Sequence, residues 1–320
     1  MSLSTIVIIF IIISVLISFA IGANDETMAT IYGSRTLKMR EILILAVIFA
    51  ILGAFLLGGS VSETVGKDLL FFTVSNSVVL TILISTSIWL IISSIFGLPI
   101  STTHATIGSI IGVGFLLGGG GGINWLTILE MGIWWLLSPL IGYIVTYFAY
   151  KLIHKSIVSK LSGFRNYEKA ERIFSIILLV VICWTAFSRA GNDCSNAVGI
   201  VSGLGIDLNF ILLIAGLSLA SGIVVIGRGV IKNVGTITEL HPSTAFASEI
   251  PTAVILFLGT LLGIPLSGSH MLVASLVGLS KARRAPMSKG LWKIVLIWLL
   301  TFPAAAILSI FIYFPINLYI

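Results

Sequence analysis

Residues 97–104, Gly-Leu-Pro-Ile-Ser-Thr-Thr-His, recur 166 positions later at residues 263–270 as Gly-Ile-Pro-Leu-Ser-Gly-Ser-His. An Asn-Asp pair precedes each copy, at residues 24–25 and 192–193. Two kinds of motif that return in the same order, at nearly one offset, indicate that the chain is an internal duplication. The two halves are therefore expected to share one structural plan.

The composition decides the class of protein in which this duplication occurred. Of the 320 residues, 58% are hydrophobic and 9% are charged, and the mean hydropathy is +1.16. Soluble domains carry about 25% charged residues, so a soluble globular protein is excluded. The apolar residues fall in stretches of about 20, the length needed to cross a bilayer core of about 30 Å. The first stretch, residues 5–20, follows no basic residue, so we interpret it as a transmembrane helix rather than a signal peptide.

Ten apolar segments can be drawn, five in each half. Because five is an odd number, the second half must enter the membrane upside down, as in the inverted repeats of secondary transporters. The fourth and ninth segments are short and rich in Gly and Ser, which is typical of broken or re-entrant helices. The predicted fold is an all-α polytopic membrane protein with about ten transmembrane segments in two inverted five-segment repeats. The segments cover residues 3–21, 41–58, 69–96, 101–117, 129–153, 172–188, 208–226, 245–262, 267–279 and 291–314.

The basic residues predict how these segments are oriented. Of the 18 Lys and Arg residues, 16 lie on odd-numbered connections, and only Lys67 and Arg189 lie on the other side. Basic loops face the cytoplasm, so both termini are expected outside the cell membrane. The net charge of +6 then reflects topology and does not indicate nucleic-acid binding. The first repeat is predicted over residues 1–154 and the second over 172–320, with a short basic cytoplasmic linker at 155–171, in one transmembrane transporter domain.

The Asn-Asp pairs are the first candidate site. An Asp within an apolar segment costs roughly 2.5–3.5 kcal/mol on insertion scales, so a duplicated pair indicates a use. We interpret Asp25 and Asp193 as hard oxygen ligands of a cation such as Na+, and Asn24 and Asn192 as ligands of the substrate. The alternative is that both pairs cap helix ends at the membrane surface. Glu249 lies inside the eighth segment and is a further candidate for the coupling cation, with an interfacial position as its alternative.

The repeated Ser/Thr motifs are the second candidate site. In each, Gly and Pro interrupt a helix, and the restarting helix presents free N–H groups and the positive end of its dipole beside several hydroxyls. Such an arrangement can hold an anion without a basic side chain. Ordinary N-capping by Ser101 and Ser267 is the alternative, and it explains one hydroxyl in each copy. For His104 and His270 we favour a structural role, in which each holds its own hairpin by hydrogen bonds.

At these motifs the sequence closely resembles the PiT family of inorganic phosphate transporters, which is related to sodium–phosphate symporters. The resemblance spans nearly the whole chain and rests on the quoted motifs, with Gly-Asn-Asp-Cys-Ser-Asn-Ala at residues 191–197. It implies a multi-pass symporter with an inverted repeat that moves phosphate with Na+ or H+ and needs no other cofactor. It also implies that the Asn-Asp motifs and the Ser/Thr hairpins form the substrate and cation sites.

The resemblance completes the set of candidate residues. The predicted substrate-binding residues are Asn24, Ser101, Thr102, Thr103, Asn192, Asn196, Ser267 and Ser269, and the hairpins are shaped by Pro99, His104, Pro265 and His270. The chain also departs from the family pattern. The first motif of the family usually reads Gly-Ala-Asn-Asp-Val-Ala-Asn-Ala, and here Glu26, Thr27 and Met28 replace Val-Ala-Asn. The second Ser-Thr-Thr-His has become Ser-Gly-Ser-His, with Gly268 in place of a hydroxyl.

The function expected from the sequence is cation-coupled symport of inorganic phosphate by alternating access in a lipid bilayer. A permease for sulfate or another oxyanion on the same fold is the main alternative. A channel and an intramembrane hydrolase are further alternatives, although no unique nucleophile and no metal-binding spacing support the hydrolase. The sequence leaves open whether the chain acts alone or as a homo-oligomer.

Overall fold

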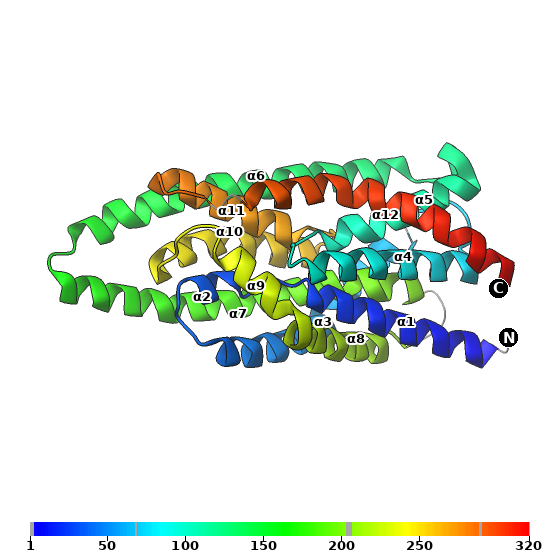
Figure 1. The fold of residues 1–320 in the computed structure, drawn as a ribbon, viewed down its shortest axis with the longest axis horizontal. Coiled ribbons are helices and arrows are strands. Elements are labelled where there is room, and N and C mark those ends of the chain that lie inside the picture. Colours follow the sequence, from blue (N-terminus) through cyan, green and yellow to red (C-terminus); the bar gives the residue numbers. More distant parts are fainter. Residues whose placement is uncertain (1–2, 68, 203–206, 288–289, 320) are drawn as a thin grey trace.

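A computed structural model describes residues 3–67, 69–202, 207–287 and 290–319. The described part of the chain is built of helices without any strand, apart from one isolated bridge between Leu70 and Ile123. The helices lie side by side along the long axis of the molecule (Figure 1). The predicted all-α membrane fold is therefore confirmed. The elements are α1 (Leu3–Ala23), α2 (Ala29–Gly33), α3 (Met39–Lys67), α4 (Asn76–Ile95), α5 (Thr102–Gly118), η1 (Gly119–Gly122), α6 (Trp125–Ser156), η2 (Val158–Lys160), α7 (Phe164–Ser202), α8 (Leu208–Gly222), η3 (Ile223–Gly227), α9 (Arg228–Gly235), α10 (Pro242–Leu261), α11 (Gly268–Arg283) and α12 (Leu291–Tyr319).

Eight helices in the described residues are long and apolar enough to cross a membrane. The expected first and ninth segments fall outside this group. The apolar part of α1, Val7–Ala23, is shorter than the eight spanning helices. Helix α11 has 16 residues, and its last turn carries Lys281 and Arg283. The fourth segment corresponds to α5, which reaches the length of a membrane span, Thr102–Gly122, when the following turn η1 is included. The count of ten crossings therefore stays a prediction.

Two predicted boundaries are wrong, because hydropathy does not show where a helix begins or ends. The third segment was expected from residue 69, but α4 begins at Asn76, where the Ser75 hydroxyl accepts a hydrogen bond from the Val78 N–H. This leaves 20 residues, enough for one crossing. The sixth segment was expected to end at residue 188, whereas α7 is 39 residues long and continues to Ser202. The linker expected at 155–171 overlaps the end of α6 at Ser156 and the start of α7 at Phe164, and its place between the two repeats stays a prediction.

Four of the main packing contacts join different halves of the chain, while α10 packs on α7 within the second half. Helix α3 packs on α7, α1 on α8, α5 on α12 and α6 on α11. Small residues allow this close approach, as is common between helices in membranes. At Gly53 in α3, an added Cβ would lie 1.9 Å from the carbonyl oxygen of Phe187 in α7. These two helices therefore touch along their backbones at this point.

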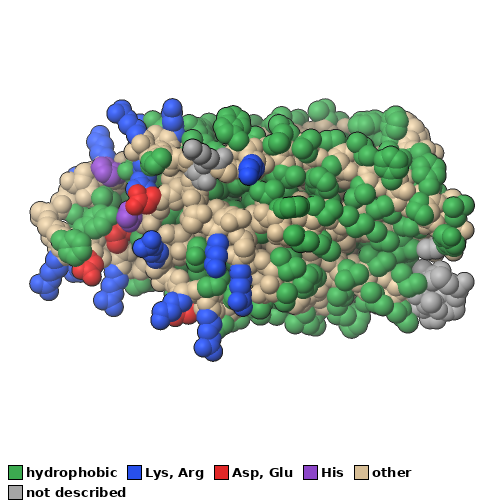
Figure 2. Space-filling model, in the orientation of Figure 1, with side chains coloured by type: hydrophobic (Ala, Val, Ile, Leu, Met, Phe, Trp, Pro, Cys, Tyr) green, Lys and Arg blue, Asp and Glu red, His purple; other side chains and the backbone are tan. Residues whose placement is uncertain are grey.

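The surface separates an apolar body from a charged end. Figure 2 shows that nearly all the visible Lys, Arg, Asp, Glu and His side chains gather at one end, and that hydrophobic side chains cover the rest of this face. Both termini lie at the opposite end of the molecule (Figure 1). This separation agrees with the predicted parity of the loops, although Lys67 and Lys289 fall outside the residues whose side chains are described. Which end faces the cytoplasm stays a prediction.

The contact between α3 and α7 gives a test of the packing. Gly53→Ala should lower the free energy of unfolding by about 1–3 kcal/mol, because its Cβ would push against the α7 backbone. Gly59→Ala, in the same helix, is the matched control, since nothing lies within 4 Å of its added Cβ. Thermal unfolding of both variants in detergent measures the difference. Equal midpoints for the two variants would show that α3 and α7 do not approach as described.

Candidate functional site

The first Asn-Asp motif lies at a true helix break. Helix α1 ends at Ala23, and Asn24 follows in the connection to α2. The side chain of Asn24 donates from Nδ2 to the Leu98 carbonyl at 2.9 Å and to Ser94 Oγ at 3.2 Å. Its Oδ1 accepts from the Ile100 N–H at 2.8 Å. One buried amide thereby holds the chain on both sides of Pro99, where the α4–α5 connection has no helical partners.

The second motif makes the same set of contacts. Asn192 Nδ2 donates to the Ile264 carbonyl at 3.0 Å and to Thr260 Oγ1 at 3.2 Å, and its Oδ1 accepts from the Leu266 N–H at 3.2 Å. Each of these three partners lies 166 positions after its counterpart in the first half. The expectation that both pairs lie at helix ends is wrong for the second one, because Asn192 and Asp193 lie within α7. Both asparagines are structural clamps here, and their role as substrate ligands stays a prediction.

The two Ser/Thr hairpins are joined to each other. Thr103 Oγ1 donates to the Leu266 carbonyl at 2.9 Å, and the equivalent Ser269 Oγ donates to the Ile100 carbonyl at 3.0 Å. Each hairpin thus receives a hydroxyl from the other half of the chain. The segments of residues 97–104 and 263–270, which lie far apart in the sequence, therefore form one buried unit.

Aromatic rings continue this contact between the halves. The His104 and His270 rings meet edge to face, with centroids 4.6 Å apart, and each also packs on a Trp at 4.2 Å. Those tryptophans cross over as well: Trp135 Nε1 donates to the Pro265 carbonyl and Trp298 Nε1 to the Pro99 carbonyl, both at 3.1 Å. Within the described structure, Nε2 of neither histidine has a hydrogen-bond partner. The Nε2 atoms therefore do not make the hydrogen bonds that were expected to hold each histidine to its own hairpin. The contact between the two histidine rings instead connects one hairpin to the other.

The capping interpretation is confirmed for one hydroxyl in each hairpin. Ser101 Oγ accepts from the His104 N–H at 3.1 Å, and Ser267 Oγ accepts from the His270 N–H at 3.3 Å. Each hairpin also turns at a glycine with positive φ, +63° at Gly97 and +71° at Gly263, a conformation that other residues rarely adopt. Thr102, Thr103 and Ser269 are left as the hydroxyls that capping does not explain.

Arg189 is the residue that the sequence interpretation missed. It was assigned to a loop, but it lies in α7 with 3% of its side chain exposed. Its Nη1 bonds to Glu26 Oε1 at 2.7 Å and lies 3.9 Å from Asp25 Oδ1, and its Nε bonds to Asp193 Oδ2 at 3.0 Å. We call Asp25, Glu26, Arg189 and Asp193 the central ion cluster. The expectation that no basic side chain takes part in the site is wrong, because this cluster joins both Asn-Asp motifs.

The hairpins contact the central ion cluster directly. Thr102 Oγ1 donates to Asp193 Oδ1 at 2.9 Å, so the first hairpin reaches the second motif. Ser269 Oγ accepts from Arg189 Nη2 at 3.0 Å, so the second hairpin reaches the guanidinium. Charge-assisted bonds of this kind are about twice as strong as neutral ones and offset part of the penalty of burying ions. The two predicted sites are therefore one site.

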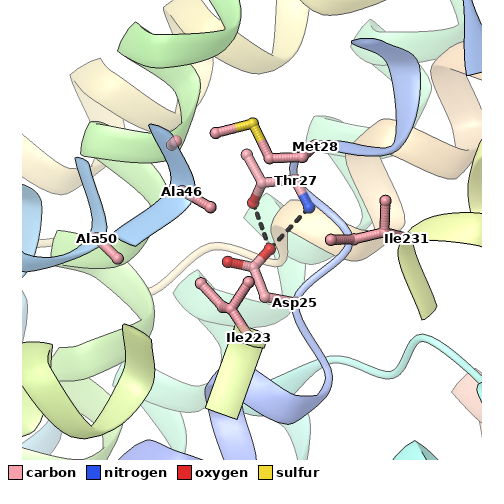
Figure 3. A pocket seen from close by; sticks show the side chains of 8 residues that line it. Asp25, Thr27, Met28, Ala46, Ala50, Ile223 and Ile231 are labelled. Carbon is pink, nitrogen blue, oxygen red and sulfur yellow. Dashed lines mark hydrogen bonds between the residues drawn. The ribbon is translucent and has the colours of Figure 1, made fainter. Parts of the chain in front are cut away.

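Asp25 lies at the edge of this site, on a small cavity. Figure 3 shows its carboxylate beside Thr27, whose N–H and hydroxyl both donate to Asp25 Oδ1, at 2.7 and 2.5 Å. The cavity is closed mainly by apolar side chains, and its free space is about that of one water molecule. With 13% of its side chain exposed, Asp25 is the most accessible acid of the cluster. The space in this cavity is too small for an oxyanion.

Two further predicted residues lie next to the cluster. Glu249 is fully buried in α10 and accepts from Thr30 Oγ1 at 2.6 Å and from Thr185 Oγ1 at 3.3 Å. Asn196 lies one turn after Asn192 in α7, and its Nδ2 is 3.5 Å from Thr103 Oγ1. The buried Oδ1 of Asn196 has no hydrogen-bond partner within the described structure, so it could accept from a ligand.

The predicted Na+ position does not fit the residues found there. Asp25 and Asp193 were expected to share the ion, but the Arg189 guanidinium lies against both carboxylates. Elsewhere in the described chain, no three or more His, Cys, Asp or Glu side chains are arranged to hold a metal ion. One positive charge of the protein therefore already lies beside these two acids and offsets part of their negative charge.

Known proteins share this fold and sequence. A solved structure titled "The sodium-dependent phosphate transporter" has a TM-score of 0.88 and 26% identity, and the alignment covers 99% of this chain and 100% of that one. A Pyrococcus furiosus protein named "Putative phosphate permease" is 27% identical, over 95% of this chain and 94% of its own. The chloroplastic inorganic phosphate transporter 2-1 of Arabidopsis thaliana is 25% identical, over 91% of this chain and 68% of its own.

The family comparison agrees with these likenesses and with the motifs at the site. Residues 21–309 match the family described as the phosphate transporter family, and this range contains both Asn-Asp pairs, both hairpins and Arg189. The resemblance to phosphate transporters noted from the motifs is thus confirmed, and the alternative of an enzyme is set aside because the family consists of transporters. The chain belongs to the phosphate transporter family.

Proposed function

We propose that this protein is a permease for inorganic phosphate that carries out cation-coupled symport by alternating access. One observation carries the proposal: two hydroxyl-bearing hairpins from the two halves of the chain meet around one buried ion cluster. Thr102 contacts Asp193 and Ser269 contacts Arg189, so a ligand bound by the hairpins would lie against charged groups of the central ion cluster. The membership of the chain in a family of phosphate transporters supports phosphate as that ligand.

The anion is proposed to bind at the starts of α5 and α11. These helices begin at Thr102 and Gly268 and are 17 and 16 residues long. The first N–H groups of a helix and the positive end of its dipole favour an anion, and the hydroxyls of Thr102, Thr103 and Ser269 add donors at the same place. Asn196 Oδ1 and Asp25 would face the protonated oxygen of phosphate. Sulfate at neutral pH lacks that O–H, so these acceptors would disfavour it.

The two halves are proposed to be the inverted repeats that move against each other. The matched contacts of Asn24 and Asn192, and the reciprocal bonds of Thr103 and Ser269, support such a relation. Rocking of one repeat against the other around a central site is the usual form of alternating access. A polar hollow at the charged end, lined by Arg35, Lys38 and residues 235–241, is proposed as the path by which phosphate reaches the cytoplasm. The protein is placed in the cell membrane, with its basic loops inside and both termini outside.

Substrate competition tests the proposed function. Purified protein in proteoliposomes should take up radiolabelled phosphate, and unlabelled phosphate should compete whereas sulfate at the same concentration should not. The physical reason is the unpaired acceptor that sulfate would leave in a buried site. Uptake of labelled sulfate that phosphate inhibits would instead establish the alternative oxyanion permease. Accumulation against a gradient distinguishes a transporter from a channel.

The hydroxyl groups should contribute in a graded way. Thr102→Val and Ser269→Ala should each reduce phosphate uptake by about fivefold or more, since the first removes one buried hydrogen bond of about 1 kcal/mol and the second removes two. The matched control is Ser159→Ala, because the Ser159 hydroxyl is exposed and, among the residues that the structure describes, bonds to the Lys155 carbonyl alone. Initial rates of phosphate uptake measure the effect. A complete loss in one variant, with full activity in the other, would favour a single nucleophile over a shared binding site.

The asparagine clamps should affect stability as well as uptake. Asn192→Ala leaves the Leu266 N–H and the Ile264 carbonyl without their partner, so the free energy of unfolding should fall by about 1–3 kcal/mol. Asn166→Ala is the control, because this exposed side chain bonds only to the Ser162 carbonyl. Thermal unfolding in detergent gives the comparison. An unchanged midpoint with reduced phosphate affinity would show that Asn192 is a substrate ligand rather than a clamp.

A further inference from the structure

We propose that Arg189 is a built-in cation that takes the place of Na+ between the two Asn-Asp motifs, so that phosphate uptake by this protein does not require Na+. This inference rests on the proposed function and deepens it by selecting the coupling ion. Of the two cations proposed for symport, it leaves H+. It also separates this protein from the structural relative whose title states a sodium-dependent transporter.

The first support is the bonding of the guanidinium. All three of its nitrogens have oxygen partners: Nε bonds to Asp193, Nη1 to Glu26 and Nη2 to Ser269. The planar fork of an arginine holds several oxygens in fixed directions and keeps its charge at all relevant pH values. The carboxylates of Asp25, Glu26 and Asp193 are thereby partly neutralised by a cation that is covalently attached to α7 and cannot leave.

The second support is the space in which the guanidinium lies. A Cβ added to Gly268 would lie 2.8 Å from Arg189 Nε, 3.0 Å from its Cδ and 3.1 Å from its Cζ. A Cβ contact of 2.8 Å is almost never found in proteins, so a side chain at position 268 would require the Arg189 side chain to move from this position. The departure from Ser-Thr-Thr-His to Ser-Gly-Ser-His thus has a physical reason: the missing side chain leaves room for Arg189.

The third support is the carboxylate that faces the arginine. Glu26 stands where the family motif usually has Val, and its side chain is fully buried at 2.7 Å from Arg189 Nη1. A buried carboxylate without a cation would carry a large desolvation penalty, and Arg189 offsets it. Glu26, Arg189 and Gly268 come from three separate segments. Glu26 pairs with the charge of Arg189, and Gly268 leaves the space that the Arg189 side chain fills.

A Na+ at this place would be opposed by the arginine. It would have to share the oxygens of Asp25 and Asp193 with a guanidinium that already bonds to or faces them. Two cations at contact distance in a buried site repel strongly, because little water screens them. Glu26, Asp193 and Glu249 are buried, and we find no other metal-binding group in the described residues.

The groups that could carry a coupling proton face the same cluster. The connection after α1 contributes Asp25 and Glu26, α7 contributes Arg189 and Asp193, and α10 contributes Glu249, while the nearby α5 and α11 contribute the hydroxyls of Thr102 and Ser269. Glu26 Oε2 is buried and has no hydrogen-bond partner within the described structure. A proton can therefore be added to this oxygen without breaking an existing bond, and it needs no cage of ligands as Na+ does.

Ion replacement in proteoliposomes tests the inference on the intact protein. Phosphate uptake should be equal, within about twofold, when external Na+ is replaced by choline, and it should rise with an inward proton gradient and fall when a protonophore collapses that gradient. A loss of about tenfold or more in choline would overturn the proposal. Uptake that ignores the proton gradient would overturn the assignment of H+. No phosphate uptake under any gradient would instead refute the proposed function.

Variants of Arg189 provide a gain of function that a purely structural role would not produce. Arg189→Ala combined with Gly268→Thr removes the cation and restores a hydroxyl, so its uptake should become dependent on Na+ by about tenfold. Arg189→Lys keeps a tethered charge and should remain independent of Na+. Arg228→Gln, which removes an exposed arginine from α9, is the control for the loss of one positive charge.

A binding measurement keeps the test valid if a variant transports poorly. Na+ should raise the thermal unfolding midpoint of the detergent-solubilised double variant and leave that of the wild type unchanged relative to choline, because a bound ion stabilises only the state that binds it. A Na+-specific increase in the wild type would contradict the proposal. A double variant that folds, yet neither binds Na+ nor depends on it for uptake, would also contradict it.

Discussion

A helix that stops inside a membrane leaves N–H and C=O groups that no water can satisfy, and this constraint shapes the centre of the protein. Asn24 and Asn192 resolve it, because each amide bonds to a carbonyl and to an N–H in the nearby hairpin. The need for backbone partners therefore brings each Asn-Asp motif against a Ser/Thr motif. The functional groups are neighbours because the interrupted helices require clamps at these positions.

The charges at the centre follow from that arrangement. Once the clamps fix both motifs beside the hairpins, Asp25 and Asp193 are held close together in a region of low dielectric, where like charges repel strongly. Arg189 relieves this repulsion by bonding to Asp193 and Glu26 and by lying near Asp25. The hairpin hydroxyls then complete the hydrogen bonds of the ions. The hydrogen bonds of the interrupted helices, the ion pairs of Arg189 and the proposed binding of substrate thus all depend on the contacts between the Asn-Asp motifs and the hairpins.

Much of this could be predicted from the sequence, since duplication and hydropathy both report on side-chain polarity. The capping by Ser101 and Ser267 was an alternative that follows from the repeated residues, whereas the joining of the two kinds of motif in one region was expected only from the family resemblance. Arg189 was missed because hydropathy falls near residue 188, although the helix continues to residue 202. Its spacing of four residues from Asp193 was a usable signal, because such residues lie on one helical face. At residues 69–75 the error was the reverse: hydropathy predicted a helix from residue 69, whereas α4 begins only at Asn76.

The two equivalent motifs differ in mechanical support. Asn192 and Asp193 are embedded in α7, a continuous helix of 39 residues, whereas Asn24 and Asp25 lie in a short non-helical connection between α1 and α2. Bending α7 there would break helical hydrogen bonds, while the connection at 24–28 can change its dihedral angles without that loss. The stiffness of the site is therefore unequal: one side is a continuous helix that carries Arg189 and Asp193, and the other is a non-helical connection that carries Asp25 and Glu26. Any motion that opens the ion cluster meets the least resistance on the side of Asp25.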